Sequence, residues 1–397
     1  MFFLNLQIKD KLLFILIAIY LFFLAYSEAL KNITVYLLLI YFLLQLLIGR
    51  VALTKDIINI SIISHLFVVI IGIWIGINSK ESLNQFMDIT HITLVFLFFR
   101  EMNLKFLTYE KILQLLFLGF SFAILLGMYI LFIHGGDGTS WTRLELHSVG
   151  SVNRTSVYIV YIFVTSLCFV NNYRAGLNRY LIPFVFYLSL ISVVIASSRM
   201  AVFSLPFIIM LYYIFSKRIS LKNTLLLILA SSIFIYTLFS FIDFPSEIET
   251  SMKILDYFVY KVSNGFDDPI RMQIWSSVIY AWTENNLWFG IGVGNSIFID
   301  VATYFPGGAL TNYIDNAHNV YLDMLLERGI FGLVTFMSFM VSLLFIQNDS
   351  KLMPSFFLKI LVFSLLIMGL ANITFRYEFA LLFVTLVGAF LNPSIRK

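Results

Sequence analysis

The chain has 397 residues, of which 60% are apolar and only 12% are charged, and its mean hydropathy is +0.93. Soluble domains carry about 25% charged residues, so this composition excludes an ordinary soluble enzyme. The net charge is only +4, and basic residues form no stripe outside short loops, which argues against a nucleic-acid partner. The single cysteine, Cys168, excludes an internal disulfide and a cysteine-based metal cluster.

Apolar runs bounded by charged or turn residues predict transmembrane helices of about 20 residues each. The sequence therefore predicts an all-α polytopic membrane protein with about 12 transmembrane helices. The fourth run is the weakest, because Asp88 and His91 lie inside it. The expected spans are 12–27, 33–48, 57–77, 84–99, 112–133, 155–170, 180–196, 200–215, 224–242, 330–346, 355–371 and 377–391.

The first run ends in Ala25-Tyr26-Ser27, as a cleavable signal peptide would, but the many later spans favour a retained anchor. With the N-terminus cytoplasmic, fifteen of the 26 lysines and arginines fall in inner segments and six in short outer loops. The positive-inside rule then predicts that both termini are cytoplasmic and that the working face is extracytoplasmic.

Three parts of the chain follow from this topology. Residues 1–242 hold spans one to nine and a short outer loop at 134–154, residues 243–329 form one long outer segment with interfacial helices, and residues 330–397 hold the last three spans. A major-facilitator transporter would instead place its long loop midway between two related halves, and neither feature is visible.

A helix is expected in the long outer segment, with Asp268 as its cap, Pro269 at its first position and Arg271 in its first turn. Glu284-Asn285-Asn286 would end it. Its apolar residues recur at helical spacing and are expected to form one stripe that faces the membrane or the bundle: Met272, Trp275, Val278, Ile279 and Trp282.

Two motifs follow this helix. Gly290, Gly292 and Gly294 could cradle a phosphate, but no strand precedes them and no lysine follows, so a turn is the better interpretation. His318-Asn319 then precedes a helical pattern, which puts His318 at a helix N-terminus. Such a position favours anions and a neutral imidazole that can act as a base, although histidines there are more often capping or packing residues.

Further candidate residues are cations near predicted outer ends of spans. Arg199 follows Ser197-Ser198, and either binds an anion or extends to the membrane surface. Arg376 stands beside Glu378, where a structural ion pair is the plainer interpretation. An arginine fork can bind a diphosphate without titrating. The shorter outer loop adds donors that would bind sugar hydroxyls or be merely solvated: Arg143, His147, Asn153 and Arg154.

Acidic and histidine residues do not cluster as metal ligands would, and no Asp-x-Asp occurs, so the sequence predicts metal-independent chemistry without a cofactor.

Four motifs of the chain, taken in their order along the sequence, resemble the O-antigen ligase/polymerase superfamily. The resemblance covers about residues 197–332 and rests on Ser197-Ser198-Arg199, Arg271-x-x-x-Trp275, Phe289-Gly290-Ile291-Gly292 and His318-Asn319-x-Tyr321 with Glu327-x-Gly329-x-x-Gly332. His147-Ser148-Val149-Gly150 to Asn153 looks like the shorter outer loop of the same proteins.

This resemblance implies a metal-independent glycosyltransferase of GT-C-like architecture in the bacterial inner membrane, working at the periplasmic face. The donor would be an oligosaccharide on undecaprenyl diphosphate. By position, Arg199 and Arg271 would bind the departing diphosphate and His318 would be the base or orienting group for the acceptor hydroxyl. Asn319, Arg376 and the loop donors would bind substrate.

The shared motifs leave the acceptor open. A polymerase would extend another lipid-linked glycan, whereas a ligase would transfer the chain to lipid A-core. The compact chain, rich in Phe, Ile, Tyr and Asn, favours the polymerase. The Gln-Pro-Asn signature of protein O-oligosaccharyltransferases is not found in the shorter outer loop. A lipid-linked oligosaccharide transporter is the rival class. Membrane lipid and a chain-length regulator are further candidate partners.

Overall fold

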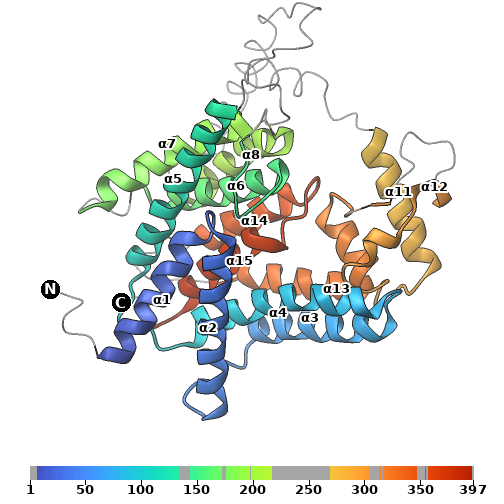
Figure 1. The fold of residues 1–397 in the computed structure, drawn as a ribbon, viewed down its shortest axis with the longest axis horizontal. Coiled ribbons are helices and arrows are strands. Elements are labelled where there is room, and N and C mark those ends of the chain that lie inside the picture. The colour runs from blue at the N-terminus through green and yellow to red at the C-terminus, as the bar shows by residue number, and fades with distance from the viewer. Residues whose placement is uncertain are drawn as a thin grey trace, which may run out of the picture.

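The structure of the chain, a computed structural model, describes residues 7–134, 144–171, 176–196, 198–216, 269–304, 313–314, 316–346, 354 and 356–395. Within these residues the regular elements are helices, and strand-like pairing is limited to isolated bridges. Figure 1 shows their arrangement. The elements are α1 (Ile8–Phe23), α2 (Glu28–Leu47), α3 (Ile57–Ile75), α4 (Ser79–Glu101), α5 (Tyr109–His134), α6 (Val152–Phe169), α7 (Asn178–Ala196), α8 (Arg199–Ser216), α11 (Pro269–Glu284), the 3₁₀ helix η2 (Asn295–Phe298), α12 (Val301–Tyr304), α13 (Val320–Leu344), α14 (Phe357–Met368) and α15 (Tyr377–Leu391).

Eight of the described helices, α2 to α8 and α13, are long and apolar enough to cross a membrane. Two shorter apolar helices, α14 and α15, coincide with the last two expected spans. The all-α polytopic class predicted from the sequence is therefore confirmed. The ninth expected span, 224–242, lies outside the described residues.

Short polar residues begin several of these helices, because a side-chain oxygen can accept a backbone N–H that has no partner in the first turn. The Asp56 carboxylate accepts from Asn59 at 3.0 Å at the start of α3. At the start of α4, the Asn78 side chain accepts from the backbone N–H groups of Lys80 and Glu81. Such residues separate apolar runs in the sequence, which is why most of the predicted spans agree with the helices; α1, at 16 residues, is not among those long enough to cross a membrane.

Two pairs of packed spans are distant in sequence, α13 with α3 and α15 with α4, whereas α6 packs against α7, the next helix in the chain. In Figure 1, α3, α4 and α13 run side by side, and α11 and α12 lie at the edge of the molecule farthest from α1. Because these side chains meet in the interior, the core is formed mainly by aliphatic and aromatic residues of the spans.

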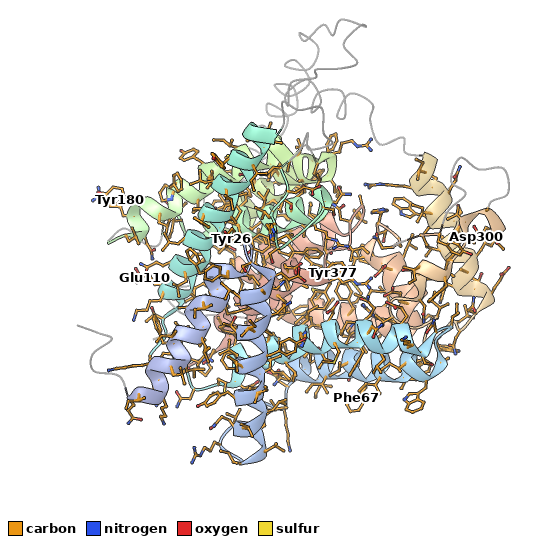
Figure 2. The ribbon with its side chains drawn as sticks, viewed as in Figure 1. Tyr26, Phe67, Glu110, Tyr180, Asp300 and Tyr377 are labelled. Atoms are coloured by element: carbon orange, nitrogen blue, oxygen red, sulfur yellow. The ribbon has the colours of Figure 1, made fainter. Side chains whose placement is uncertain are left out.

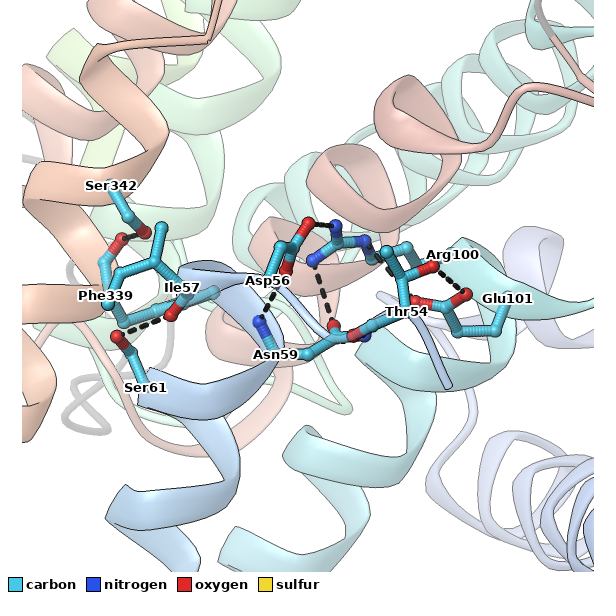
Figure 3. Close-up of polar contacts among 9 residues, drawn as sticks. All are labelled: Thr54, Asp56, Ile57, Asn59, Ser61, Arg100, Glu101, Phe339 and Ser342. Atoms are coloured by element: carbon cyan, nitrogen blue, oxygen red, sulfur yellow. Dashed lines mark hydrogen bonds and ion pairs between the residues drawn. The ribbon is translucent and has the colours of Figure 1, made fainter. Parts of the chain in front are cut away.

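A polar cluster ties α3 to α4 at the end of the bundle that is predicted to be cytoplasmic (Figure 3). The buried Arg100 guanidinium forms an ion pair with Asp56 and donates to the Asn59 side chain at 2.8 Å. Glu101 in turn accepts from Thr54 at 2.8 Å. Since a buried guanidinium is costly unless it is paired and hydrogen-bonded, this cluster explains how an arginine can close the end of a span.

Helix α11 begins at Pro269 and ends at Glu284, and it holds Arg271 in its first turn, as the sequence predicts. The apolar stripe predicted on it is buried only in part: Val278 is buried, and Trp275 and Trp282 pack against the same core cluster. Met272 and Ile279 are 58% and 44% exposed, whereas Ile274 is buried with Val278. The face that packs against α12 and α13 is therefore rotated from the predicted one, and Met272 and Ile279 are left on the outside.

Helix α13 is broken at Gly329, which has φ +63° and ψ −165°. Breaking a helix frees backbone groups on both sides, and these groups need new partners. The glycine turn of residues 287–294 supplies them: Ile291 N–H donates to Leu326 O at 2.8 Å, and Ile330 N–H donates to Leu287 O at 3.0 Å. The break thus joins the outer segment to the start of the tenth predicted span.

Candidate functional site

The Arg271-x-x-x-Trp275 motif joins α11 to two other segments of the chain. Residues four apart on a helix lie on one face, so the two side chains reach in the same direction. Arg271 Nη1 donates to the backbone oxygen of Ala371 at 3.0 Å, and Trp275 Nε1 donates to the backbone oxygen of Ala317 at 2.9 Å. The motif therefore holds α11 against the residue before His318 and against the loop between α14 and α15.

His318 stands directly before the N-cap of α13 and has a positive φ of +48°. The Asn319 side chain caps the helix by accepting from Tyr321 N–H at 2.9 Å. It also donates to Leu370 O at 3.0 Å, and Val320 N–H donates to Gly369 O at 2.9 Å. The His318 segment is thereby held against the same loop that receives Arg271.

Arg271 and the two residues that follow His318 therefore bond to one short segment, residues 369–371, although Arg271 and His318 are 47 positions apart in the sequence. Arg199 is the first residue of α8 and is half-buried. Helix α8 packs against α14, which leads directly into residues 369–371. The convergence of Arg199 with the other two residues stays a prediction.

Arg376 forms an ion pair, as one interpretation of the sequence expects, but its partner is not Glu378. Its guanidinium lies 3.6 Å from a Glu327 carboxylate oxygen and donates to the Gln85 side chain at 2.8 Å. Glu378 is paired instead with Lys31. With only 4% of its surface exposed, Arg376 makes internal contacts, and its predicted role in substrate binding stays a prediction.

The charge on Arg376 is stabilised by two carboxylates on α13. Burial lowers the pKa of Arg376, but the Glu327 and Asp323 carboxylates raise it more, so the pKa ends above its ordinary value. The guanidinium is therefore charged at any physiological pH.

Glu327 also binds the glycine turn. Gly294 N–H donates to the Glu327 carboxylate at 2.9 Å, and the hydroxyl of Ser296 lies 3.4 Å from the same oxygen. Gly290, Gly292 and Gly294 all have positive φ, so the turn predicted for them is confirmed. One carboxylate thus connects the turn to Arg376, a role that the motif position of Glu327 does not reveal.

The predicted ligands of the shorter outer loop are distributed differently. His147 and Arg154 line a cavity of about 360 Å³, and Arg154 is placed with its guanidinium carbon 3.8 Å from the centre of the Tyr377 ring. Asn153 is half-buried at the start of α6, and Arg143 lies outside the described residues. Figure 2 labels Tyr377 near the middle of the molecule.

The remaining walls of this cavity come from residues to which the sequence assigned no site role. Among them, Asp88 and His91 did leave a signal, because they weaken the hydropathy of the fourth predicted span. Nothing in the sequence indicates Lys31 as a cavity residue, because it stands near the end of a predicted span, as loop lysines do. In the structure it belongs to α2 and is 2% exposed. The described lining does not include Arg199, Arg271 or His318, so the cavity is distinct from the Arg271–His318 region.

No group of three or more His, Cys, Asp and Glu side chains gathers as a metal site within the residues that the structure describes. The independence from metal that the sequence suggests stays a prediction.

The helices and their composition define a multi-pass, all-α membrane protein. Its particular relationship comes from the comparison with known families: the model of the O-antigen ligase family matches residues 184–337. This match confirms the resemblance to the O-antigen ligase/polymerase superfamily. It covers less than half of the chain, but it contains Arg199, Arg271 and His318. No curated protein matches the chain.

Proposed function

We propose that this protein is a glycosyltransferase of the bacterial inner membrane that uses a glycan on undecaprenyl diphosphate as donor at the periplasmic face. We further propose that it is the polymerase that joins repeat units of a surface polysaccharide. The observation that supports this proposal is the attachment of Arg271 and the His318 segment, both inside the matched family region, to adjacent backbone oxygens of residues 369–371.

The chemistry follows from these groups. An acceptor hydroxyl attacks the anomeric carbon of the donor sugar, the bond from that carbon to the diphosphate oxygen breaks, and undecaprenyl diphosphate leaves. Negative charge grows on the departing oxygen, and a fixed guanidinium beside it stabilises that charge. Arg271, with Arg199, would supply this stabilisation. His318 would take the proton of the acceptor hydroxyl, a contribution of about 10²–10⁴-fold in rate.

Variants of Arg271 and His318 test this proposal in the strain that carries the gene. We expect Arg271→Ala and His318→Ala to abolish long-chain polysaccharide, measured as the ladder of chain lengths, while the protein still accumulates in the membrane. Arg50→Ala is the matched control, because Arg50 is exposed in the loop after α2, at the predicted cytoplasmic end. Normal ladders from the Arg271 and His318 variants would refute the proposal.

A ligase is the second candidate, and the description of the matching family favours it. Purified protein supplied only with lipid-linked repeat units separates the two activities. Chains that grow on the lipid identify a polymerase, whereas a product that forms only after lipid A-core is added identifies a ligase.

A further inference from the structure

Ionisable side chains from three apolar helices meet at the cavity of about 360 Å³. Lys31 comes from α2, Asp88 and His91 from α4, and Glu378 from the first turn of α15. Asp88 follows the first residue of α4 by nine positions, which is about 14 Å along the helix axis. A charged group at the centre of a bilayer costs roughly 2.5–3.5 kcal/mol on the mildest scale, so such groups usually mark a binding site.

Some of these groups are explained by their contacts with one another. Lys31 forms an ion pair with Glu378 and lies 3.4 Å from the Ser148 hydroxyl. Arg154 stacks on Tyr377, as described above. These contacts fix the walls of the cavity and account for the presence of their charges.

Asp88 and His91 are not explained in this way. Both line the cavity, and among the described side chains neither has a hydrogen-bond partner. The one described contact of the His91 ring is with the edge of Tyr36, at 4.8 Å between ring centres. The charges of Lys31 and Arg376 act on Asp88, but the hydrogen-bonding atoms of this carboxyl group and of the His91 imidazole have no described protein partner and are therefore available to a bound molecule.

The size and charge of the cavity limit what that molecule can be. The volume lies within the range of small-ligand pockets, about 300–1,000 Å³. Among the lining residues that the structure describes, three carboxyl side chains, those of Glu28, Asp88 and Glu378, face two permanent cations, Lys31 and Arg154. With no excess of positive charge, the cavity does not favour a diphosphate. Donors and acceptors in close proximity suit hydroxyl groups, which both donate and accept.

We propose that this cavity binds an uncharged sugar unit of the acceptor glycan, with Asp88 and His91 hydrogen-bonded to its hydroxyls. This inference rests on the proposed function, because it assigns the acceptor a site separate from that of the donor diphosphate. Polar contacts lead from α4 beside this cavity to α13, the helix that follows His318: Gln85, one turn before Asp88 on the same face, accepts from Arg376. Arg376 in turn is paired with Glu327 beside the glycine turn.

Calorimetric titration of the purified full-length protein tests the proposal without any transfer reaction. The probe is the lipid-free repeat-unit oligosaccharide, released from its lipid by mild acid. We expect Asp88→Asn to weaken binding about tenfold, the effect of weakening a hydrogen bond to a charged group. Glu81→Gln is the matched control on the same helix, because an amide oxygen there can still accept from Gln85. His91→Gln should weaken binding as Asp88→Asn does, and serves if the Asp88 variant fails to fold.

Equal affinities of the wild type and both cavity variants would overturn the proposal. Displacement of the oligosaccharide by inorganic pyrophosphate would overturn it as well, since it would identify a diphosphate site. Binding that depends on Asp88, together with normal polysaccharide ladders from Arg271→Ala, would refute the proposed function and leave sugar binding standing. If Arg271→Ala abolishes long-chain polysaccharide but Asp88→Asn leaves the affinity for the oligosaccharide unchanged, only the proposed acceptor site is refuted.

Discussion

Gly290 and Gly329 show why particular residues in the family motifs are glycines. A Cβ atom on Gly290 would lie 2.4 Å from Leu326 O, and one on Gly329 would lie 2.3 Å from the backbone carbon of Trp288. The contacts are with backbone, which cannot rotate away as a side chain can. The two backbones therefore approach each other at a distance that only glycine permits.

Gly290→Ala is expected to destabilise the protein more than Gly49→Ala. Both glycines have φ near +70°, so both variants incur the cost of a left-handed backbone, about 1–2 kcal/mol. Gly49 has nothing within 4 Å of its Cβ position, whereas Gly290 adds a backbone clash of about 1–3 kcal/mol. Thermal unfolding of the detergent-solubilised protein measures the difference, and equal shifts in Tm would show that the close approach does not occur.

The Glu327–Arg376 pair makes a second prediction at this scale. Glu327→Gln leaves the Arg376 guanidinium buried beside a neutral amide and should lower the free energy of unfolding by about 3–5 kcal/mol. Arg376→Gln should also lower it, but by less, because the buried Glu327 carboxylate keeps the Arg328 guanidinium 3.9 Å away. Because the double variant removes both charges, its loss should be smaller than the sum of the two single losses. Additive losses in this cycle would contradict a direct ion pair.

The identity of that pair could not have been predicted from the sequence. Arg376 has Glu378 two positions away, and Glu327 is 49 positions away. Proximity in sequence favours Glu378, but residues i and i+2 at the start of a helix point in different directions. The partner is decided by the packing of α15 against α4 and of α13 against the glycine turn, which local sequence does not encode.

At the scale of the element, α11 could be predicted in position but not in orientation. Pro269 and the helical spacing of apolar residues give its start and its extent. The buried face depends on the packing of α11 against α12 and α13, which local sequence does not encode. The result is that Met272 and Ile279, which helical spacing places on the same stripe as Val278, are exposed while Val278 is buried.

Trp275→Phe tests whether the docking of α11 positions Arg271. The variant keeps the ring but removes the hydrogen bond to Ala317 O, and a small misplacement of a binding group can lower a rate about 10²-fold. We expect transfer to fall strongly while the protein accumulates in the membrane. Trp282→Phe is the control, because the described hydrogen bond of that indole goes to Leu287 O, just past the end of its own helix. Equal activities of the two variants would mean that the Trp275 bond has no positioning role.

For the whole molecule, hydropathy predicted the spans well, because alternation of apolar runs with capping and charged residues is a local property. The long-range pairing of spans is not local. Asp88 and His91 weakened a predicted span, and only the packing of α4 against α15 shows that they line a cavity. A polar residue in an apolar run therefore indicates that a site exists without indicating its partners.

The predicted orientation can be measured by labelling cysteines with a maleimide that does not cross membranes. Cys168 is the one cysteine of the chain, and it is buried. It is replaced first, so that each introduced cysteine is the single target of the label. Lys80→Cys lies at an exposed position at the start of α4 and should react in intact cells. Arg50→Cys lies at an exposed position just after the C-terminal end of α2, on the predicted cytoplasmic side, and should react only after the membrane is opened. The reverse pattern would invert the topology and exclude a periplasmic site.

The most direct test of the central claim, that Arg271 and His318 act in one site, is a double-mutant comparison of transfer by the purified protein. The measured quantity is the rate of undecaprenyl diphosphate release from lipid-linked repeat units, with lipid A-core added in a parallel reaction. Residues that act as a unit are strongly non-additive. We predict that Arg271→Ala and His318→Ala each lower the rate about 10²-fold or more. The double variant should then be little worse than the poorer single variant. Full activity in either single variant, or losses that multiply in the double variant, would contradict a shared site.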